Sequence, residues 1–433
     1  MPIRPSAAVL LAVAVFTVVL VAVLPAGPPA GDSAPAVTWT PPVSDPADPP
    51  PSPGSLTGPD EPATEMRPAP SEASLEVVRT DATRPIRSGV RAAPAVVKAI
   101  YLTSWSAATP SRLAQAVDLI TRTELNAVVI DIKDYSGKVV FETANPGVAA
   151  VGSVERRLDL AVLVRRLHEN GIYVIVRIAV FQDQHLIKVR PELAVRNPAG
   201  RVWRDRKGLG WVDPASQEVW TYIVEVARAA ADAGVDELNF DYIRFPSDGN
   251  LSGIRYPVFK AGTQTRREVL QQFFAYLTAE LRDAGPVLSA DLFGLATVRE
   301  DDLGIGQVLE DALLHFDVVA PMVYPSHYAR GFLGYANPAA HPYEVIVYSL
   351  NRAVRRRQRL ANTLAALSEE GERGGTHPLG QIRPWLQAFD LGAPYPPSAV
   401  RREMQAVLDA GLRSGWLLWS PSNRYQAAVF QRE

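Results

Sequence analysis

A carboxylate at the end of an apolar segment is the first feature of this sequence that suggests chemistry. Residues 236–246 are DELNFDYIRFP, and a period of two places Glu237, Asn239 and Asp241 on one face of a β-strand. Such a polar face is typical of a strand that presents its last carboxylate to a ligand. The alternative is that Asp241 caps the following loop or pairs with Arg244.

Four further charged residues lie toward the ends of other apolar segments. Asp131 and Lys133 lie on one face at the end of a second segment, Arg177 lies in a third, and Asp291 lies near the end of a fourth. Charged groups inside apolar strands are costly unless they are paired. The set predicts either a polar cleft or an internal salt-bridge network of Asp131, Lys133, Arg177 and Asp241.

Two acidic side chains on adjacent strands are suited to breaking a glycosidic bond. One carboxyl group protonates the leaving oxygen, and the other attacks the sugar or activates water. Neighbouring strands are about 4.8 Å apart, so Asp241 and Asp291 can fall within the roughly 5–9.5 Å that this chemistry requires. Asp131 is the reserve acid, and Arg177 and Lys133 would favour the ionised form of Asp241.

Aromatic and polar side chains of the longer loops and strand ends suit the binding of a sugar ring. The predicted substrate-binding residues are Lys133, Arg177, Trp203, Trp211, Arg244, Tyr324, His327, Gln387 and Trp419. For Trp203 and Trp211 the alternative is a satellite core under their loop, and for His327 it is a hydrogen-bonded loop histidine. The six histidines show no metal-binding spacing, so we expect no metal site and no cofactor.

These residues need a scaffold, and the sequence alternates strand and helix signals. Strand signals cover residues 98–105, 127–133, 173–181, 237–244, 287–293, 317–324, 382–389 and 415–420. Helical patterns cover residues 111–123, 158–169, 217–233, 266–283, 343–367 and 398–410. Eight strand signals separated by helical ones predict an α/β protein, a TIM (β/α)8 barrel with enlarged loops at the C-terminal face, closed by pairing of the first strand with the last. No Gly-rich loop follows the first strand, which disfavours a dinucleotide-binding sheet.

Composition narrows the possible classes of function. The 433 residues are 47% hydrophobic and carry a net charge of -2, with no basic patch that would indicate nucleic-acid binding. Cysteine is absent, which excludes disulfides, thiolate nucleophiles and cysteine-ligated zinc.

The first 94 residues differ in composition from the rest. Arg4 precedes an uninterrupted apolar run at 7–24, which predicts an export signal in residues 1–30, either a signal peptide or a membrane anchor. Residues 31–94 are rich in Pro and Ala and predict a disordered linker. Residues 95–433 would then form the barrel outside the cytoplasm, secreted or anchored to the membrane.

Several motifs together resemble the bacterial putative glycoside hydrolase domain family. They are KAIYLT at 98–103, VIDIKD at 129–134, WVDP at 211–214, NFDYIRFP at 239–246, APMVYP at 320–325 and IRPWLQ at 382–387. The resemblance covers nearly all of residues 98–425. It implies a β/α barrel of the α-amylase and α-galactosidase type, a carbohydrate substrate and a catalytic Asp241 at the end of the fourth strand. The sequence departs from α-amylases in having Asp291 where they have a glutamate, and in having an arginine after the fourth-strand acid.

Two classes of function remain open at this point. The first is an exported glycoside hydrolase that acts on a polysaccharide or oligosaccharide of the cell envelope or the extracellular medium. The second is a non-catalytic barrel of the envelope that binds such a glycan. A third class, metal-dependent hydrolysis, lacks the ligand spacing. The acid pair separates the first two, because a binding module does not need Asp241 and Asp291 at chemical distance.

Overall fold

The computed structural model describes residues 91–369 and 378–431. The predicted export or anchor segment, residues 1–30, lies outside the described residues, as does the predicted linker up to residue 90. Within the part of the chain that is described, no helix is both long and apolar enough to cross a membrane.

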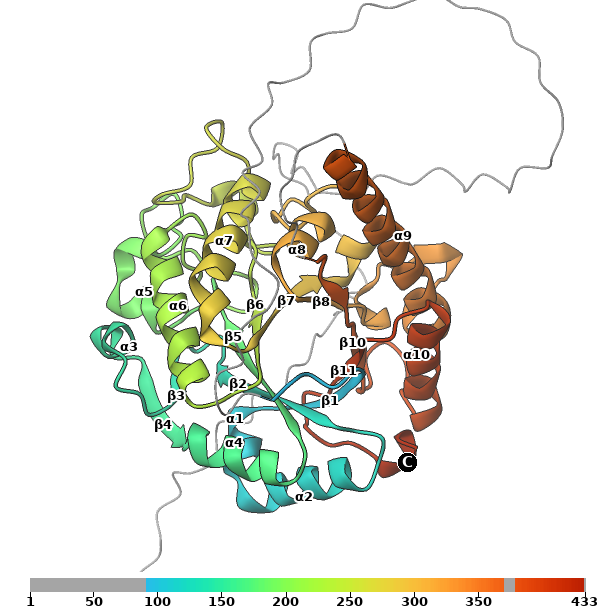
Figure 1. Ribbon diagram of the computed structural model, residues 1–433. Helices are drawn as coiled ribbons and strands as arrows, with labels where there is room; N and C mark the ends of the chain where they lie inside the picture. The colour runs from blue at the N-terminus through green and yellow to red at the C-terminus, as the bar shows by residue number, and fades with distance from the viewer. Residues whose placement is uncertain (1–90, 370–377, 432–433) are drawn as a thin grey trace, which may run out of the picture. The chain divides into compact units, whose positions relative to one another are not determined.

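Parallel strands at eight positions close into a barrel (Figure 1). In order around the barrel they are β1 (Val97–Leu102), β2 (Ala127–Lys133), β5 (Tyr173–Ala179), β6 (Glu237–Asp241), β7 (Val287–Phe293), β8 (Val318–Met322), β9 (Gln381–Ile382) with β10 (Trp385–Gln387), and β11 (Gly415–Trp419). The short strands β9 and β10 share one position, because both pair with β8. β1 pairs with β2 and with β11, and Val97 lies opposite Gly415. The predicted TIM (β/α)8 barrel and its closure are confirmed.

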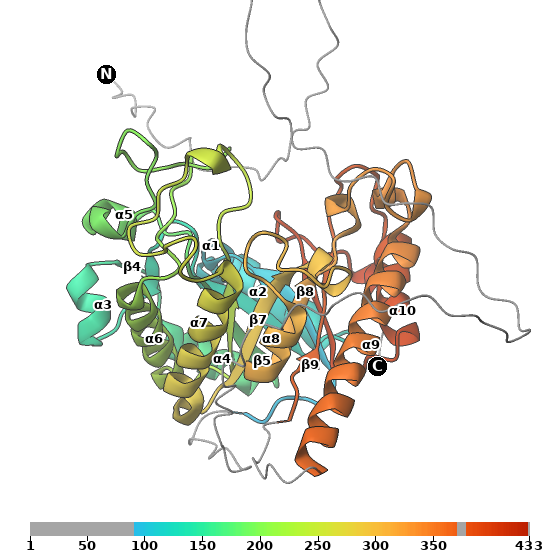
Figure 2. The same cartoon turned by 90° about the horizontal axis from the view of Figure 1, so that it is seen from above.

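Helices surround the barrel as its outer layer (Figures 1 and 2). The longer ones are α2 (Pro110–Thr121), α4 (Leu160–Glu169), α6 (Gln217–Asp232), α7 (Arg266–Leu281), α9 (Pro342–Glu369) and α10 (Pro397–Asp409). The shorter ones are α1 (Ser104–Ala108), α3 (Pro146–Val151), α5 (Leu186–Val189) and α8 (Leu309–His315). Local sequence sets their starts: Thr265 and Glu268 form a capping box at α7, and Asp159 caps α4.

Two features of the fold were not predicted from the sequence. Residues 139–158 form β3 (Val139–Phe141), α3 and β4 (Val154–Leu158), and β3 pairs antiparallel with β2. β1, β5, β6, β8, β10 and β11 each end before the predicted strand does, because the chain leaves the barrel there. The catalytic candidates nevertheless stay within or at the ends of their strands.

Alternate residues along each strand contribute to two separate cores. Ala99, Ile175 and Leu417 belong to a small core inside the barrel, whereas Ile100 and Leu418 belong to the large core between strands and helices. A residue's position in this alternation therefore decides whether its side chain faces the barrel interior. Toward the C-terminal ends of the strands, polar residues at inward-facing positions line the interior.

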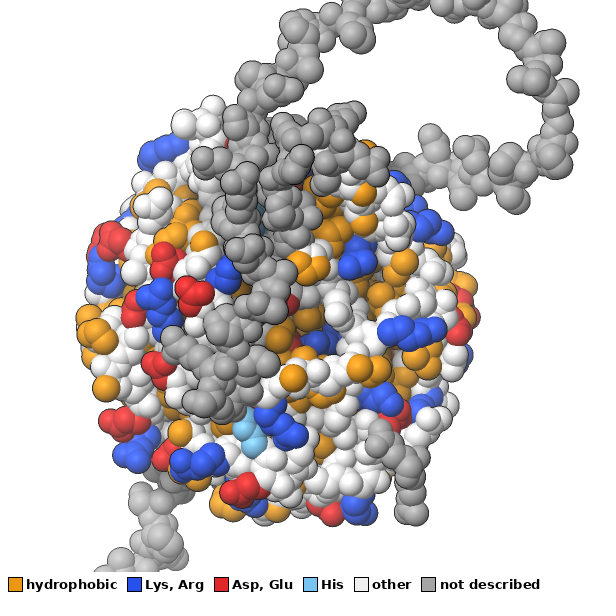
Figure 3. Space-filling model, in the orientation of Figure 1, with side chains coloured by type: hydrophobic (Ala, Val, Ile, Leu, Met, Phe, Trp, Pro, Cys, Tyr) orange, Lys and Arg blue, Asp and Glu red, His pale blue; other side chains and the backbone are white. Residues whose placement is uncertain are grey.

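The loops that follow β5, β6 and β8 gather at one end of the barrel, at the top of Figure 2. Acidic and basic side chains are interspersed on the visible part of the face in Figure 3.

Candidate active site

Arg177 on β5 joins the three predicted catalytic acids. Its Nη1 donates to Asp131 Oδ1 at 2.7 Å, its Nη2 donates to Asp241 Oδ2, and its Nε lies 3.5 Å from Asp291 Oδ2. The acids come from β2, β6 and β7, and all three are buried, while 16% of the Arg177 side chain remains exposed. The structure therefore brings Asp131, Asp241 and Asp291 into one cluster around a guanidinium.

Strand register produces this convergence. Asp131 pairs with Arg177 across β2 and β5, and Ala179 pairs with Asp241 across β5 and β6. Asp241 ends its strand because Tyr242 takes a left-handed backbone with φ of 56°. The Tyr242 N–H donates to Asp241 Oδ1, so the turn itself helps to orient the carboxylate. A non-glycine residue in this conformation costs about 1–3 kcal/mol, and such costs cluster at functional sites.

Asp291 is held asymmetrically. Its Oδ1 accepts hydrogen bonds from Asn239 Nδ2 and Trp385 Nε1, each at 2.8 Å, whereas its Oδ2 has no hydrogen-bond partner. Only 1% of the residue is exposed. Burial and the negative charge of Asp241 raise the pKa of Asp291 to about 8, although the positive charge of Arg177 acts to lower it. The raised pKa favours the protonated form of Asp291, and Oδ2 is the oxygen that has no hydrogen-bond partner.

Asn239 and Trp385 were not among the predicted site residues, although a signal for both was present. Asn239 precedes Asp241 by two residues, and Trp385 precedes Gln387 by two, so each shares the inward face of its strand. Tyr101 was also missed. Its hydroxyl donates to Asp131 Oδ2, and burial raises the pKa of Asp131.

Lys133 corrects one sequence prediction. It was expected to share a face with Asp131, but a register shift lies between the two residues where β2 pairs with β5. Lys133 is fully buried, and its Nζ lies 2.8 Å from Asp183 Oδ2 and donates to Ala179 O at 2.7 Å. Any salt-bridge network around Arg177 therefore excludes Lys133 and includes Asp291.

The two loop tryptophans, Trp203 and Trp211, are buried, as in the alternative to substrate binding, but they belong to the large core and not to a separate satellite core. Trp203 Nε1 donates to Asn250 O at 3.0 Å, and Trp211 Nε1 donates to Asp205 Oδ2 at 3.1 Å. Their ring N–H groups are thus already satisfied within the protein.

Arg244 does not pair with Asp241, contrary to the alternative considered for that acid. Its guanidinium carbon lies 4.7 Å from the ring centroid of Trp211 and 4.5 Å from that of Phe293. Its Nη1 donates to Phe245 O at 3.1 Å and to Ser247 Oγ at 3.0 Å. Arg244 is thus packed between aromatic rings.

The remaining predicted residues meet at the ends of β8, β10 and β11. The rings of Tyr324 and Trp419 stack with centroids 5.5 Å apart, and the ring centroid of His327 lies 5.3 Å from that of Tyr324. Gln387 is buried, and its Oε1 accepts from Ser326 Oγ at 2.8 Å. Trp419 is half-buried. Tyr324, His327 and Trp419 thus form an aromatic group at the ends of β8 and β11.

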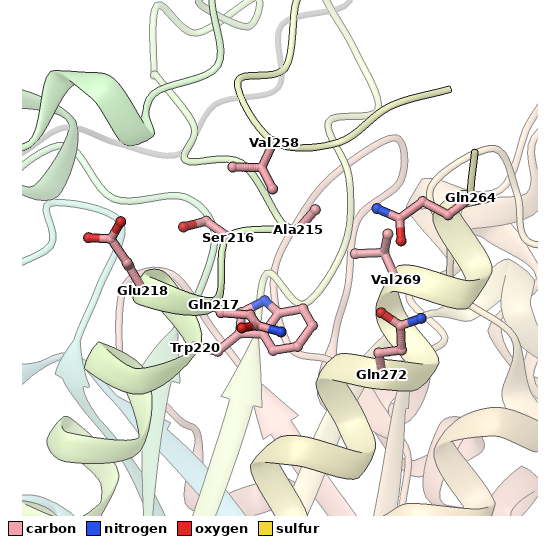
Figure 4. A pocket seen from close by; sticks show the side chains of 9 residues that line it. All are labelled: Ala215, Ser216, Gln217, Glu218, Trp220, Val258, Gln264, Val269 and Gln272. Atoms are coloured by element: carbon pink, nitrogen blue, oxygen red, sulfur yellow. The ribbon is translucent and has the colours of Figure 1, made fainter. Parts of the chain in front are cut away.

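No group of three or more His, Cys, Asp or Glu side chains with the arrangement of a metal site occurs in residues 91–369 and 378–431. A cavity of about 450 Å³ lies elsewhere, between the start of α6 and α7 (Figure 4). Its wall includes Gln217, Trp220, Gln264 and Gln272 but none of the predicted site residues. Trp220 Nε1 donates to Pro214 O at 2.8 Å, so the cavity has no free ring donor there.

Comparison with known proteins shows the family to which this chain belongs. Residues 99–425 match the protein family described as "Putative glycosyl hydrolase domain". Among proteins with curated descriptions, none matches the chain.

Three solved structures illustrate the likeness. A hypothetical protein from Ruminiclostridium thermocellum is 37% identical over 48% of this chain and 98% of its own, with a TM-score of 0.41. The PgaB (BpsB) glycoside hydrolase domain from Bordetella bronchiseptica is 16% identical over 78% of this chain and 99% of its own, with a TM-score of 0.52. An α-galactosidase from Thermus thermophilus is 15% identical over 77% of this chain and 60% of its own, with a TM-score of 0.45. The PgaB domain supports the assignment of the fold.

Proposed function

Because the chain belongs to the family of putative glycosyl hydrolase domains, and is thereby an enzyme of the glycoside hydrolase type, we propose that Asp291 and Asp241 are its two catalytic carboxyl groups. The observation that carries the proposal is the difference between these acids. Burial and the charge of Asp241 raise the pKa of Asp291, which favours its protonated form, whereas Asp241 accepts from a guanidinium and a backbone N–H, contacts that stabilise a negative charge. Glycoside hydrolysis needs one acid of each kind.

In this mechanism Asp291 is the general acid. Two N–H donors occupy Oδ1, so the proton resides on Oδ2 and passes from there to the glycosidic oxygen as the bond to the leaving group breaks. Asn239 and Trp385 are positioning residues for this proton. Asp241 then either attacks the anomeric carbon or takes a proton from the attacking water.

Arg177 and Asp131 support the pair. Arg177 contacts both catalytic acids, so it fixes their relative position and neutralises charge that they would otherwise share. Asp131 accepts hydrogen bonds from Arg177 Nη1 and from the Tyr101 hydroxyl. These bonds hold the guanidinium at the nitrogen that does not contact Asp241 or Asp291. Asp131 is thus a positioning residue in this proposal.

We further propose that the substrate is a polysaccharide or oligosaccharide of the cell envelope or the extracellular medium. The apolar run at residues 7–24 and the Pro-rich stretch after it support export, secreted or anchored. The half-buried ring of Trp419 beside Tyr324 offers a surface on which a sugar can stack.

The test is a screen of the purified protein against envelope and storage polysaccharides, read by release of reducing ends. We expect turnover of at least one polymer, and its loss in Asp241→Asn. Tight binding of a glycan without turnover, unchanged in Asp241→Asn, would replace this proposal with the non-catalytic glycan-binding barrel.

A further inference from the structure

Arg244 is exceptional among the buried arginines of the described residues. Three are less than a tenth exposed: Arg244 at 9%, Arg356 at 2% and Arg383 at 3%. Arg356 pairs with Glu310, and Arg383 Nη1 lies 2.8 Å from Glu237 Oε2. Within the described ranges Arg244 has no carboxylate within 4 Å.

A buried cation without a counter-ion is costly, and proteins seldom keep one without a use for it. The protein satisfies Arg244 only through Nη1, with the carbonyl of Phe245 and the hydroxyl of Ser247 as acceptors. Among the described residues, Nε and Nη2 have no acceptor. Burial lowers the pKa of Arg244, and the nearby Tyr242, Asp241, Asp248 and Asp205 act in the opposite direction without forming an ion pair with it.

The position of Arg244 ties it to the acids. It follows Asp241 by three residues, and Phe293, one of three rings against it, follows Asp291 by two. A second ring, Trp211, belongs to the long loop after β5 and also packs against the third, Tyr242, with centroids 6.0 Å apart. The rings hold the guanidinium plane in place, so its free N–H groups are preorganised beside the cluster.

From these contacts we propose that Arg244 binds an oxyanion substituent of the sugar substrate, a carboxylate or a phosphate ester. A guanidinium presents parallel N–H donors that match two oxygens of such a group. The proposal rests on the proposed function, in that the bound molecule is the glycan on which Asp241 and Asp291 act. It adds that this glycan is anionic next to the scissile bond.

The test measures binding directly, with glucose, glucuronate and glucose 6-phosphate as probes, by calorimetry on the full chain. We expect one of the two anionic sugars to bind at least tenfold more tightly than glucose, and the favoured one identifies carboxylate or phosphate. Arg244→Met, which keeps length and packing between the rings but removes the charge, should abolish this preference. Arg244→Lys should retain part of it, because the charge remains but the planar fork is lost.

The matched control is Arg204→Met, which removes an exposed arginine from the same loop as Trp211. It should leave the preference unchanged, and equal losses in Arg204→Met and Arg244→Met would reduce the effect to overall charge. Wild-type protein that binds neither anionic sugar more tightly than glucose overturns the proposal. The proposal is also overturned if Arg244→Met weakens the binding of all three probes equally and unfolds at a lower temperature, because Arg244 then has only a structural role.

The two proposals fail separately. Hydrolysis of neutral glycans, unaffected by Arg244→Met, would leave the catalytic assignment standing and remove the anion site. Arg244-dependent binding of an anionic sugar without any turnover would do the reverse.

Discussion

At the scale of single residues, the protonation of Asp291 decides the pH dependence of the proposed reaction. Its pKa is about 8 in the folded protein, so activity should fall as pH rises through about 8 and the acid loses its proton. Asp291→Ala should slow glycosides with poor leaving groups about 10²–10⁴-fold and spare activated aryl glycosides, which need little protonation. Comparing kcat on the two substrate types checks this. If Asp131→Ala spares aryl glycosides instead, the acid is misassigned.

The same group affects stability, with a sign that can be worked out. Between the ordinary value of 3.8 and about 8, the folded state holds a proton on Asp291 that the unfolded state has lost. This contribution to the free energy of unfolding is therefore complete below pH 3.8, decreases as pH rises from there, and is lost once pH has passed about 8. Asp291→Asn cannot titrate, so its free energy of unfolding should vary less over this range than that of the wild type. Urea unfolding at several pH values measures the difference, and identical slopes would contradict the raised pKa.

Asp241→Asn should separate activity from stability. Arg177 keeps Asp131 and Asp291 as partners in this variant, so we expect the free energy of unfolding to change by about 1 kcal/mol or less while the rate falls by orders of magnitude. Because the charge of Asp241 raises the pKa of Asp291, any residual activity should decline at a lower pH. Arg177→Met is the contrast, since it strips the cation from the buried acids and should cost about 3–5 kcal/mol. Unfolding of Asp241→Asn would favour a structural salt-bridge network.

At the scale of elements, β2 shows what sequence periodicity can and cannot predict. The apolar run 127–133 gives the strand with its observed bounds, and Asp131 faces inward as predicted. Lys133 does not, because the irregular register near the strand end turns it toward Asp183 and the Tyr222 ring. A shift of this kind depends on the backbone beyond the strand, where β3 begins to pair, and leaves no mark in the periodicity.

Loops limited the predictions for a related reason. The sequence placed Trp203 and Trp211 in the right loop, but whether a tryptophan faces a ligand or the core depends on how that loop folds, and both belong to the core. Arg177 could be predicted as part of the cluster because it lies within a regular strand. The asymmetric hold on Asp291 could not, since it requires Trp385 from a strand that lies two barrel positions away.

The Lys133 pair should hold the start of the long loop after β5. Both Lys133 and Asp183 are fully buried, and Asp183 Oδ1 also accepts from the backbone of Leu186 at 2.6 Å. Lys133→Met leaves Asp183 buried and unpaired, so we expect a loss of about 3–5 kcal/mol in the free energy of unfolding. Lys98→Met, which breaks a partly exposed pair with Glu124, should cost about 1 kcal/mol or less. Equal effects in urea unfolding would mean that Asp183 finds another partner or water.

At the scale of the whole barrel, the seam between the first and last strands is where closure depends on one backbone position. Gly415 begins β11 opposite Val97 with φ of 94°, and a Cβ placed there would lie 1.8 Å from the Val97 carbonyl oxygen. The two strands approach so closely at this point that an added methyl group has to push backbone apart. The sequence predicted the pairing of these strands, but the close approach is a property of the closed barrel only.

Gly415→Ala should therefore destabilise the protein by more than about 4 kcal/mol, in the range reserved for severe defects. Gly411→Ala is the matched control: its φ of 79° also favours glycine, but nothing lies within 4 Å of a Cβ there. The free energy of unfolding of that variant should fall by only about 1–2 kcal/mol, the cost of the left-handed backbone conformation for alanine. Urea unfolding of both variants measures the difference, which isolates the steric cost at the seam. If the two substitutions cost the same, β1 and β11 can separate without loss, and closure contributes little to the stability of the fold that positions the acids.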